Sequence, residues 1–202
     1  MARVGVLALQ GDFAAHASAL DQLGANVREV RRVSQLEGLD GLVLPGGESS
    51  ALLRLMEGEP WFERLRLLHD AGGALFGTCA GAILLSRTVE NHPVRSLALI
   101  DVTAVRNAYG TQVDSFVATA DAGAAPGLEG LRCVFIRAPR LRDPGPGVEV
   151  LVRVDGEPVL LRQGNVFAAT FHPELTDDAR VHALLLEGAR GRDPGATAGI
   201  GR

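Results

Sequence analysis

Short apolar, β-branched runs alternate with stretches of helical spacing along the first half of the chain. The runs predict buried parallel strands at residues 3–9, 27–30, 41–45 and 74–77. Apolar residues three or four positions apart predict helices at residues 12–23, 50–56, 61–68 and 80–85. An alternation of this kind is typical of a parallel sheet with helices on both of its faces.

The pattern changes in the second half of the chain. Residues 97–117 and 131–169 carry short β-rich runs separated by turn signals, and residues 177–189 predict a closing helix. No linker-like stretch divides these runs from the rest, so we expect antiparallel or mixed strands added to the same sheet. The sequence therefore predicts one α/β domain over residues 1–190, with a mostly parallel or mixed central sheet, and a Gly- and Ala-rich flexible tail over residues 191–202.

Composition excludes several classes of function. The 202 residues include 24 acidic and 20 basic side chains, for a net charge of −4, and no block of like charge, so no nucleic-acid partner is expected. All the basic residues are Arg, which rules out mechanisms that need a lysine, such as the phosphate-binding Walker loop or Schiff-base catalysis.

The two cysteines are too few for a disulfide scaffold or a zinc site, and we expect free thiols. The N-terminus lacks the pattern of a secretory signal, and no apolar run approaches the ~20 residues that span a bilayer. We therefore expect a cytoplasmic protein with no membrane partner, no metal and no cofactor.

The segment Gly77-Thr78-Cys79-Ala80-Gly81 joins a predicted strand to a predicted helix and has the form of a nucleophile elbow. In such a turn the small neighbours let the central side chain project from the end of the sheet. The helix that follows offers backbone N–H groups that favour a thiolate and can hold an oxyanion. The alternative is a small buried cysteine in a tight crossover.

A cysteine nucleophile needs a base, and the base needs an orienting group. His172 follows the apolar run 166–170, and Glu174 lies two positions further on, on the same side of an extended chain. A Cys79–His172–Glu174 triad is thus stereochemically reasonable, whereas a surface turn is the alternative. The other histidines, His16, His69, His92 and His182, lie away from strand ends, and we expect them to be solvated or locally satisfied.

A second Gly-rich strand end, Gly46-Gly47-Glu48-Ser49, allows the backbone to approach a ligand closely, although a tight packing turn would look the same. Arg106 and Arg137 are further candidates, since an arginine near a strand end can bind a carboxylate at two points.

With these residues in place the chain resembles the class I, triad-type glutamine amidotransferases of flavodoxin-like fold. Within them it is most similar to the family of glutaminase subunits of pyridoxal 5'-phosphate synthase. The resemblance covers about residues 4–186 and rests on the segments 6–11, 44–49, 76–81, 106–110, 113–116, 135–139 and 171–175.

The resemblance implies a glutaminase that releases ammonia from L-glutamine and passes it to a barrel-shaped synthase subunit, in a hetero-oligomer that makes pyridoxal 5'-phosphate. It assigns Cys79 as nucleophile, His172 as base and acid, and Glu174 as the group that orients His172. The glutamine site would be formed by Gly47, Glu48, Ser49, Arg106, Ile136 and Arg137.

By the same resemblance, the backbone N–H groups near Gly47 and Ala80 would form the oxyanion hole, and Gln10 would take part in partner contact and switching. Tyr109, Thr111 and Ser50 depart from residues common in similar proteins, and Thr111 could weaken a contact to glutamine or to the partner. Three alternatives stay open: a glutaminase feeding another synthase, a γ-glutamyl hydrolase, and a glutamine-sensing scaffold without turnover.

Overall fold

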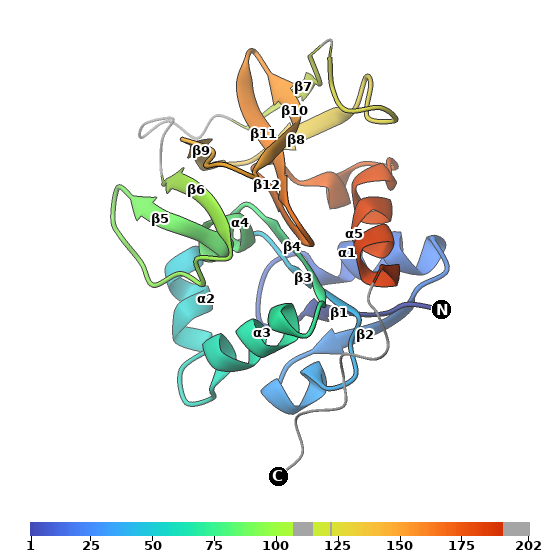
Figure 1. Cartoon of the computed structure of the whole chain (residues 1–202), viewed down its shortest axis with the longest axis vertical. Coiled ribbons are helices and arrows are strands. Elements are labelled where there is room, and N and C mark those ends of the chain that lie inside the picture. The colour runs from blue at the N-terminus through green and yellow to red at the C-terminus, as the bar shows by residue number, and fades with distance from the viewer. Residues whose placement is uncertain (107–114, 122, 192–202) are drawn as a thin grey trace.

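Five adjacent strands of a seven-stranded sheet are parallel in the computed structural model, which describes residues 1–106, 115–121 and 123–191. The strand order is β10-β11-β12-β4-β3-β1-β2, so that β2 and β10 lie at opposite edges (Figure 1). The parallel strands are β1 (Arg3–Leu7), β2 (Asn26–Val30), β3 (Gly41–Leu44), β4 (Ala74–Thr78) and β12 (Val166–Ala169). β10 (Glu149–Val154) and β11 (Glu157–Gln163) extend the sheet in antiparallel fashion.

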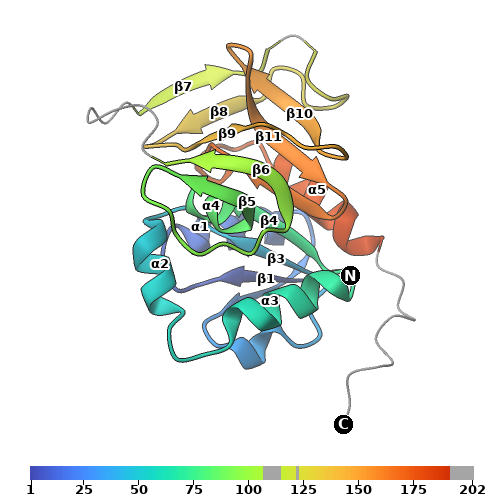
Figure 2. The ribbon, with the colours of Figure 1, turned by 60° about the vertical axis from the view of Figure 1, so that its left-hand side comes forward.

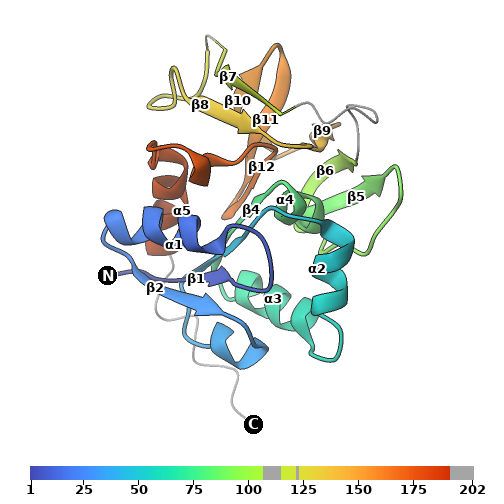
Figure 3. The same ribbon diagram turned by 180° about the vertical axis from the view of Figure 1, so that it is seen from behind.

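Helices cover both faces of this sheet (Figures 1 and 3). On one face lie α1 (Phe13–Gln22) and α5 (Arg180–Arg190). On the other face lie α3 (Trp61–Asp70) and α4 (Ala80–Leu85), with α2 (Ser49–Leu55) packed on α4. Two short 3₁₀ helices, η1 (Val33–Leu36) and η2 (Pro173–Leu175), complete the connections. The predicted α/β class with helices on both faces is confirmed.

The central strands read as unbroken apolar runs because both of their faces are buried. In β3, Leu42 and Leu44 point into the core that contains Leu65 of α3. Val43, between them, points into the opposite core with Leu20 of α1. The alternation along one strand thus supplies both hydrophobic layers of the domain.

The later β-rich runs do not all join the central sheet, and this part of the prediction is wrong. β5 (Ser86–Glu90), β6 (Ile100–Val105) and β9 (Arg140–Arg142) form a separate three-stranded sheet, and β7 (Phe116–Thr119) pairs with β8 (Arg132–Phe135) (Figure 2). β10, β11 and β12 do extend the central sheet. Short runs reveal that a segment is extended but not which edge it pairs with, since pairing depends on distant neighbours.

Most of the predicted elements lie within a few residues of the observed ones. The side chain of Asp12 caps α1 by accepting a hydrogen bond from the N–H of Ala15, as its position before the helix predicts. The closing helix begins at Arg180 rather than 177, and η2 at residues 173–175 precedes it. Residues 192–202 of the expected tail lie outside the described part of the chain. No helix in that described part is long and apolar enough to cross a membrane.

Candidate active site

The residues singled out for chemistry follow four strands that are neighbours in the sheet. Gln10 follows β1, Gly46 follows β3, Cys79 follows β4 and His172 follows β12. Because these strands are parallel, their carboxyl ends lie together at one end of the sheet, which is where ligands bind in open α/β sheets. Segments that are far apart in the sequence are thereby brought to one place.

Cys79 occupies a strained turn between β4 and α4. Its φ of 46° and ψ of −102° lie in a region that residues other than glycine rarely adopt. The turn is tight because Gly77 lies against the backbone of Gly81, and a Cβ on Gly81 would overlap the carbonyl group of Leu44. The structure therefore has the elbow that the glycines predict, with the sulfur beside the first turn of α4.

His172 and Glu174 form a buried pair beside this elbow. The Nδ1–H of His172 donates to Oε1 of Glu174 at 2.7 Å, which leaves Nε2 for the thiol of Cys79. Burial acts to lower the pKa of His172, but hydrogen bonds and negative charge from Cys79 and Glu174 outweigh it and raise the pKa to about 10. At neutral pH the imidazole of His172 is therefore protonated.

A cavity of about 130 Å³ opens in front of Cys79. It brings together every residue expected at the glutamine site, although their roles stay a prediction. Its lining consists of Gly47, Glu48, Ser49, Cys79, Ile83, Arg106, Ile136, Arg137, Pro139 and His172. Gln10, Ala80 and Glu174 lie just behind this lining, in contact with Glu48, Cys79 and His172 respectively.

Glu48 performs a structural task at the cavity wall. Its carboxylate caps α2 by accepting hydrogen bonds from the N–H groups of Ser50 and Ala51, and the bond from Ser50 is the largest cause of its lowered pKa. The guanidinium of Arg106 lies 3.7 Å from the same carboxylate and donates to the hydroxyl of Ser50. The hydroxyl group of Ser50 thus helps to hold the guanidinium of Arg106 at the cavity wall.

Gln10 reaches across from the end of β1 to the Gly-rich turn. Its side-chain N–H donates to the backbone carbonyl of Glu48 at 2.9 Å. Gly47 has a φ of 138°, and a Cβ there would lie 2.8 Å from the Gln10 amide. Gln10 therefore holds the Glu48–Ser49 peptide, beside the Gly46–Gly47 turn where the oxyanion hole is expected. Tyr109 and Thr111 lie outside the described residues.

The expectation for two of the other histidines missed their location. His16 of α1 and His182 of α5 are both fully buried, and Nε2 of His16 lies 3.3 Å from Oε2 of Glu174. The signal was present in the sequence: His16 falls on the apolar face of its helix with Phe13 and Leu20. A histidine on a buried face requires a polar partner in the interior.

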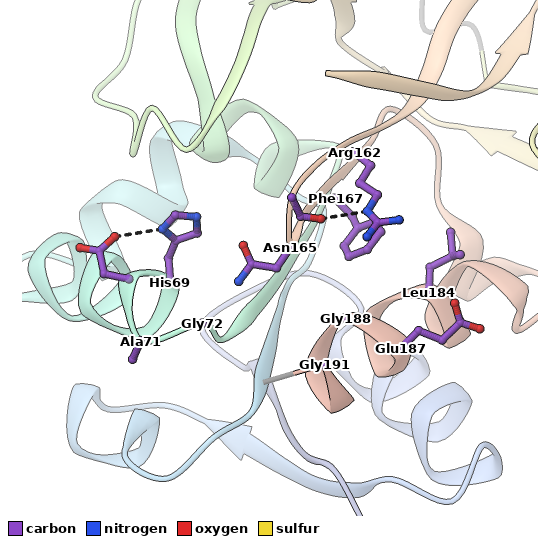
Figure 4. Close-up of a pocket in the computed structure, with 12 residues that line it drawn as sticks. His69, Ala71, Gly72, Arg162, Asn165, Phe167, Leu184, Glu187, Gly188 and Gly191 are labelled. Carbon is purple, nitrogen blue, oxygen red and sulfur yellow. Dashed lines mark hydrogen bonds and ion pairs between the residues drawn. The ribbon is translucent and has the colours of Figure 1, made fainter. Parts of the chain in front are cut away.

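A larger cavity, of about 580 Å³, lies at the other end of the sheet, near the amino ends of β4 and β12 (Figure 4). Its wall includes His69 and Gly72, which precede β4, and Asn165, which precedes β12. Several of its polar side chains bond to their neighbours: the amide of Asn165 donates to the carbonyl of Gly73, and His69 bonds to Asp70. Volume alone therefore does not mark the chemistry of this chain.

A parallel α/β sheet with a thiol on a strained elbow and an imidazole–carboxylate pair at the next strand end defines the class of triad-type cysteine amidohydrolases. Comparison with known proteins specifies the family. Residues 6–190 match the SNO glutamine amidotransferase family, and the chain belongs to that family.

Relatives cover nearly the whole chain. A protein of Koribacter versatilis named pyridoxal 5'-phosphate synthase subunit PdxT is 51% identical over 96% of this chain and 98% of its own. A protein of the same name from Deinococcus radiodurans is 50% identical over 91% and 95%. A crystal structure of a glutamine amidotransferase, 46% identical, superposes with a TM-score of 0.85 over 93% of this chain and 98% of that one.

Proposed function

We propose that this protein is the glutaminase subunit of a pyridoxal 5'-phosphate synthase. It hydrolyses L-glutamine to L-glutamate and ammonia and delivers the ammonia to a barrel-shaped synthase partner. The observation that carries the proposal is the Cys79–His172–Glu174 constellation, present in a chain whose relatives over almost all of its length bear the name of that subunit.

The geometry supports a two-stage hydrolysis. The sulfur of Cys79 attacks the side-chain amide carbon of glutamine and forms a tetrahedral oxyanion. The imidazolium of His172 gives its proton to the leaving nitrogen, so that ammonia departs and a thioester remains. Water then adds to the thioester, with its proton taken by His172, and releases glutamate. Glu174 holds the ring in one tautomer throughout.

The oxyanion requires N–H donors, which we assign to Ala80, at the start of α4, and to the turn at Gly47. Gln10 bonds the carbonyl of Glu48 and so holds the Glu48–Ser49 peptide beside the Gly46–Gly47 turn. We propose that the synthase partner reorients a peptide of the Gly46–Gly47 turn and so completes the hole, so that glutamine is not consumed without use. Glutaminase rates with and without the partner test this step, and equal rates would reject it.

Arg106 and Arg137 supply positive charge in the cavity wall for the carboxylate of glutamine, and Glu48 supplies negative charge for its ammonium group. The backbone of Arg137 has a φ of 44°, which residues other than glycine rarely adopt. We place the reaction in the cytoplasm, where the two unpaired thiols of the chain stay reduced.

A matched pair of cysteine variants tests the proposed activity. Cys79→Ala should lower ammonia release from glutamine at least ~10³-fold, because the nucleophile is removed. Cys133→Ala should retain ammonia release. Cys133 is fully buried in the core beneath α1 and α5, where burial raises the pKa of its thiol to about 12. Ammonia release that survives in Cys79→Ala would overturn the assignment.

The partner and the substrate class need a second assay. The purified chain is mixed with candidate synthase barrels, and product formation from glutamine identifies the barrel that accepts its ammonia. Cleavage of longer γ-glutamyl peptides at a rate above that of free glutamine would instead identify a γ-glutamyl hydrolase. An intact Cys79 chain that binds glutamine without turnover, with every barrel tested, would identify a sensing scaffold.

A further inference from the structure

A chain of two buried histidines lies behind the proposed triad, and the mechanism above does not use it. Nε2 of His16 lies 3.3 Å from Oε2 of Glu174 and 3.4 Å from the hydroxyl of Thr78. Nδ1 of His16 lies 2.9 Å from Nε2 of His182. All of these rings and the carboxylate are buried, so the contacts are shielded from water.

Glu174 has two oxygens, and they face different histidines. Oε1 accepts from His172, whereas Oε2 has no aligned hydrogen bond in the described part of the chain and has His16 within ion-pair distance. A buried carboxylate oxygen without a donor is costly, and a small rotation of either side chain would align the bond from His16. His16 is therefore the group placed to satisfy the outer oxygen.

A hydrogen bond from His16 to Glu174 would fix both tautomers. A carboxylate can only accept, so a neutral His16 that bonds to Glu174 carries its proton on Nε2. Its Nδ1 is then an acceptor and requires the Nε2–H of His182. This leaves a lone pair on Nδ1 of His182, and that atom indeed makes no hydrogen bond within the described residues. An unpaired acceptor is the less costly end for such a chain.

Both rings are uncharged at neutral pH. Burial lowers the pKa of His16 well below 6.5, helped by the charges of His182 and His172, and burial lowers the pKa of His182 to about 4. Phe76 lies edge-on to both rings, at 6.3 and 6.0 Å between centroids, and keeps their surroundings apolar. The pair can thus donate to Glu174 without adding a charge that would compete with His172.

We propose that His16 is a positioning residue, which holds the outer oxygen of Glu174 through an Nε2–H bond so that the inner oxygen stays on Nδ1 of His172. His182 fixes the tautomer of His16 from behind. This role rests on the proposed function for its catalytic consequence, but its effect on His172 exists in the free chain without substrate. Without the donor, Glu174 is free to rotate away from Nδ1 of His172 and then supports the charge on His172 less.

The matched variants are His16→Leu, which removes the donor, and His16→Gln, whose amide N–H can replace Nε2–H. Their side chains are similar in size. The readout is the titration of the His172 ring in the ¹⁵N-histidine-labelled free chain by NMR, assigned with His172→Gln. In His16→Leu we expect the midpoint to fall by about one pH unit or more, and in His16→Gln to stay near that of the wild type. An unchanged midpoint in a folded His16→Leu, or an equal fall in both variants, would overturn the proposal.

Glutamine hydrolysis by the complex with its partner gives the second readout. We expect kcat to fall roughly 10- to 100-fold in His16→Leu, with KM little changed and with recovery in His16→Gln, as for other groups that orient a catalytic side chain. If no activity is found in the wild type while the NMR shifts follow the expectation, the proposed function fails and the positioning role stands.

A measurement on the wild type guards against a variant that does not fold. The ¹⁵N shifts of His16 at pH 7 distinguish a ring protonated on Nε2 from one protonated on Nδ1. The proposal requires a neutral ring with its proton on Nε2. A ring protonated on Nδ1, or a charged ring, refutes it without any substitution.

Discussion

His182 should make the stability of this protein sensitive to acid in a predictable way. In the native state its ring is buried and its pKa is lowered to about 4, whereas in the unfolded chain it has the ordinary value of 6.5. Between these two values the unfolded chain binds a proton that the native state excludes. Stability from this group is therefore complete above about pH 6.5 and is lost as the pH falls toward 4.

The magnitude follows from the two pKa values. One pKa unit corresponds to about 1.4 kcal/mol, so proton uptake by the unfolded chain removes about 2 kcal/mol of unfolding free energy at pH 5 and about 3 kcal/mol at pH 4. His182→Gln retains an N–H for His16 but has no titration. The loss assigned to His182 should thus be absent from this variant. At low pH the variant also lacks the positive charge of His182, so His16 is protonated more easily in the native state. This change further reduces the loss of unfolding free energy of the variant in acid.

Urea denaturation between pH 4 and 7.5 measures this effect, with the fluorescence of the single, buried Trp61 as the probe. The quantity to follow is the difference in unfolding free energy between wild type and His182→Gln at each pH. Val181→Ala is the control, since it removes buried apolar volume next to His182 and should destabilise by an amount independent of pH. A wild-type minus His182→Gln difference that stays constant from pH 7 to pH 4 would refute the reasoning.

Three further outcomes are expected. Gly46→Ala should abolish glutamine hydrolysis while the chain still folds, because the new Cβ would lie 2.5 Å from Cε1 of His172 and 3.3 Å from Cβ of Cys79; normal turnover with a normal circular dichroism spectrum would contradict this. The rate of hydrolysis should fall on the alkaline side near pH 10, where His172 loses the proton that the leaving ammonia needs; a fall centred near pH 6.5 would count against the ion pair. Leu65→Ala should cost about 2–5 kcal/mol in urea denaturation because Leu65 is fully buried under the sheet, and a loss below ~1 kcal/mol would show that this core is loosely packed.

The first half of the fold was predictable because local signals agreed with one another. Apolar runs such as 41–45 were long enough to identify strands, and glycines after them identified turns. The same signals placed Cys79 and His172 at strand ends, and the parallel sheet then brought them together. The elbow needed no distant information, since its glycines and its cysteine lie within five positions.

Two features required the folded chain. Strand β6 pairs with β5 and β9 rather than with the central sheet, and the sequence of a short strand does not state its partner. The contact of His16 with Glu174 joins α1 to a segment near the end of the chain, at a distance that no motif spans. The apolar face around His16 showed that the ring is buried, but not which polar group it meets.

The pairing of β12 with β4 fixes the reach between sulfur and imidazole. Ala169 of β12 lies opposite Thr78 of β4. Thr78 directly precedes Cys79, and Ala169 lies three residues before His172. Sliding β12 by a single position would carry the ring about 3.3 Å along the strand and turn its side chains to the opposite layer. Proton exchange between two groups more than ninety positions apart in the chain thus depends on the register in which β12 pairs with β4. During refolding, glutamine turnover should therefore return no earlier than this strand pairing forms.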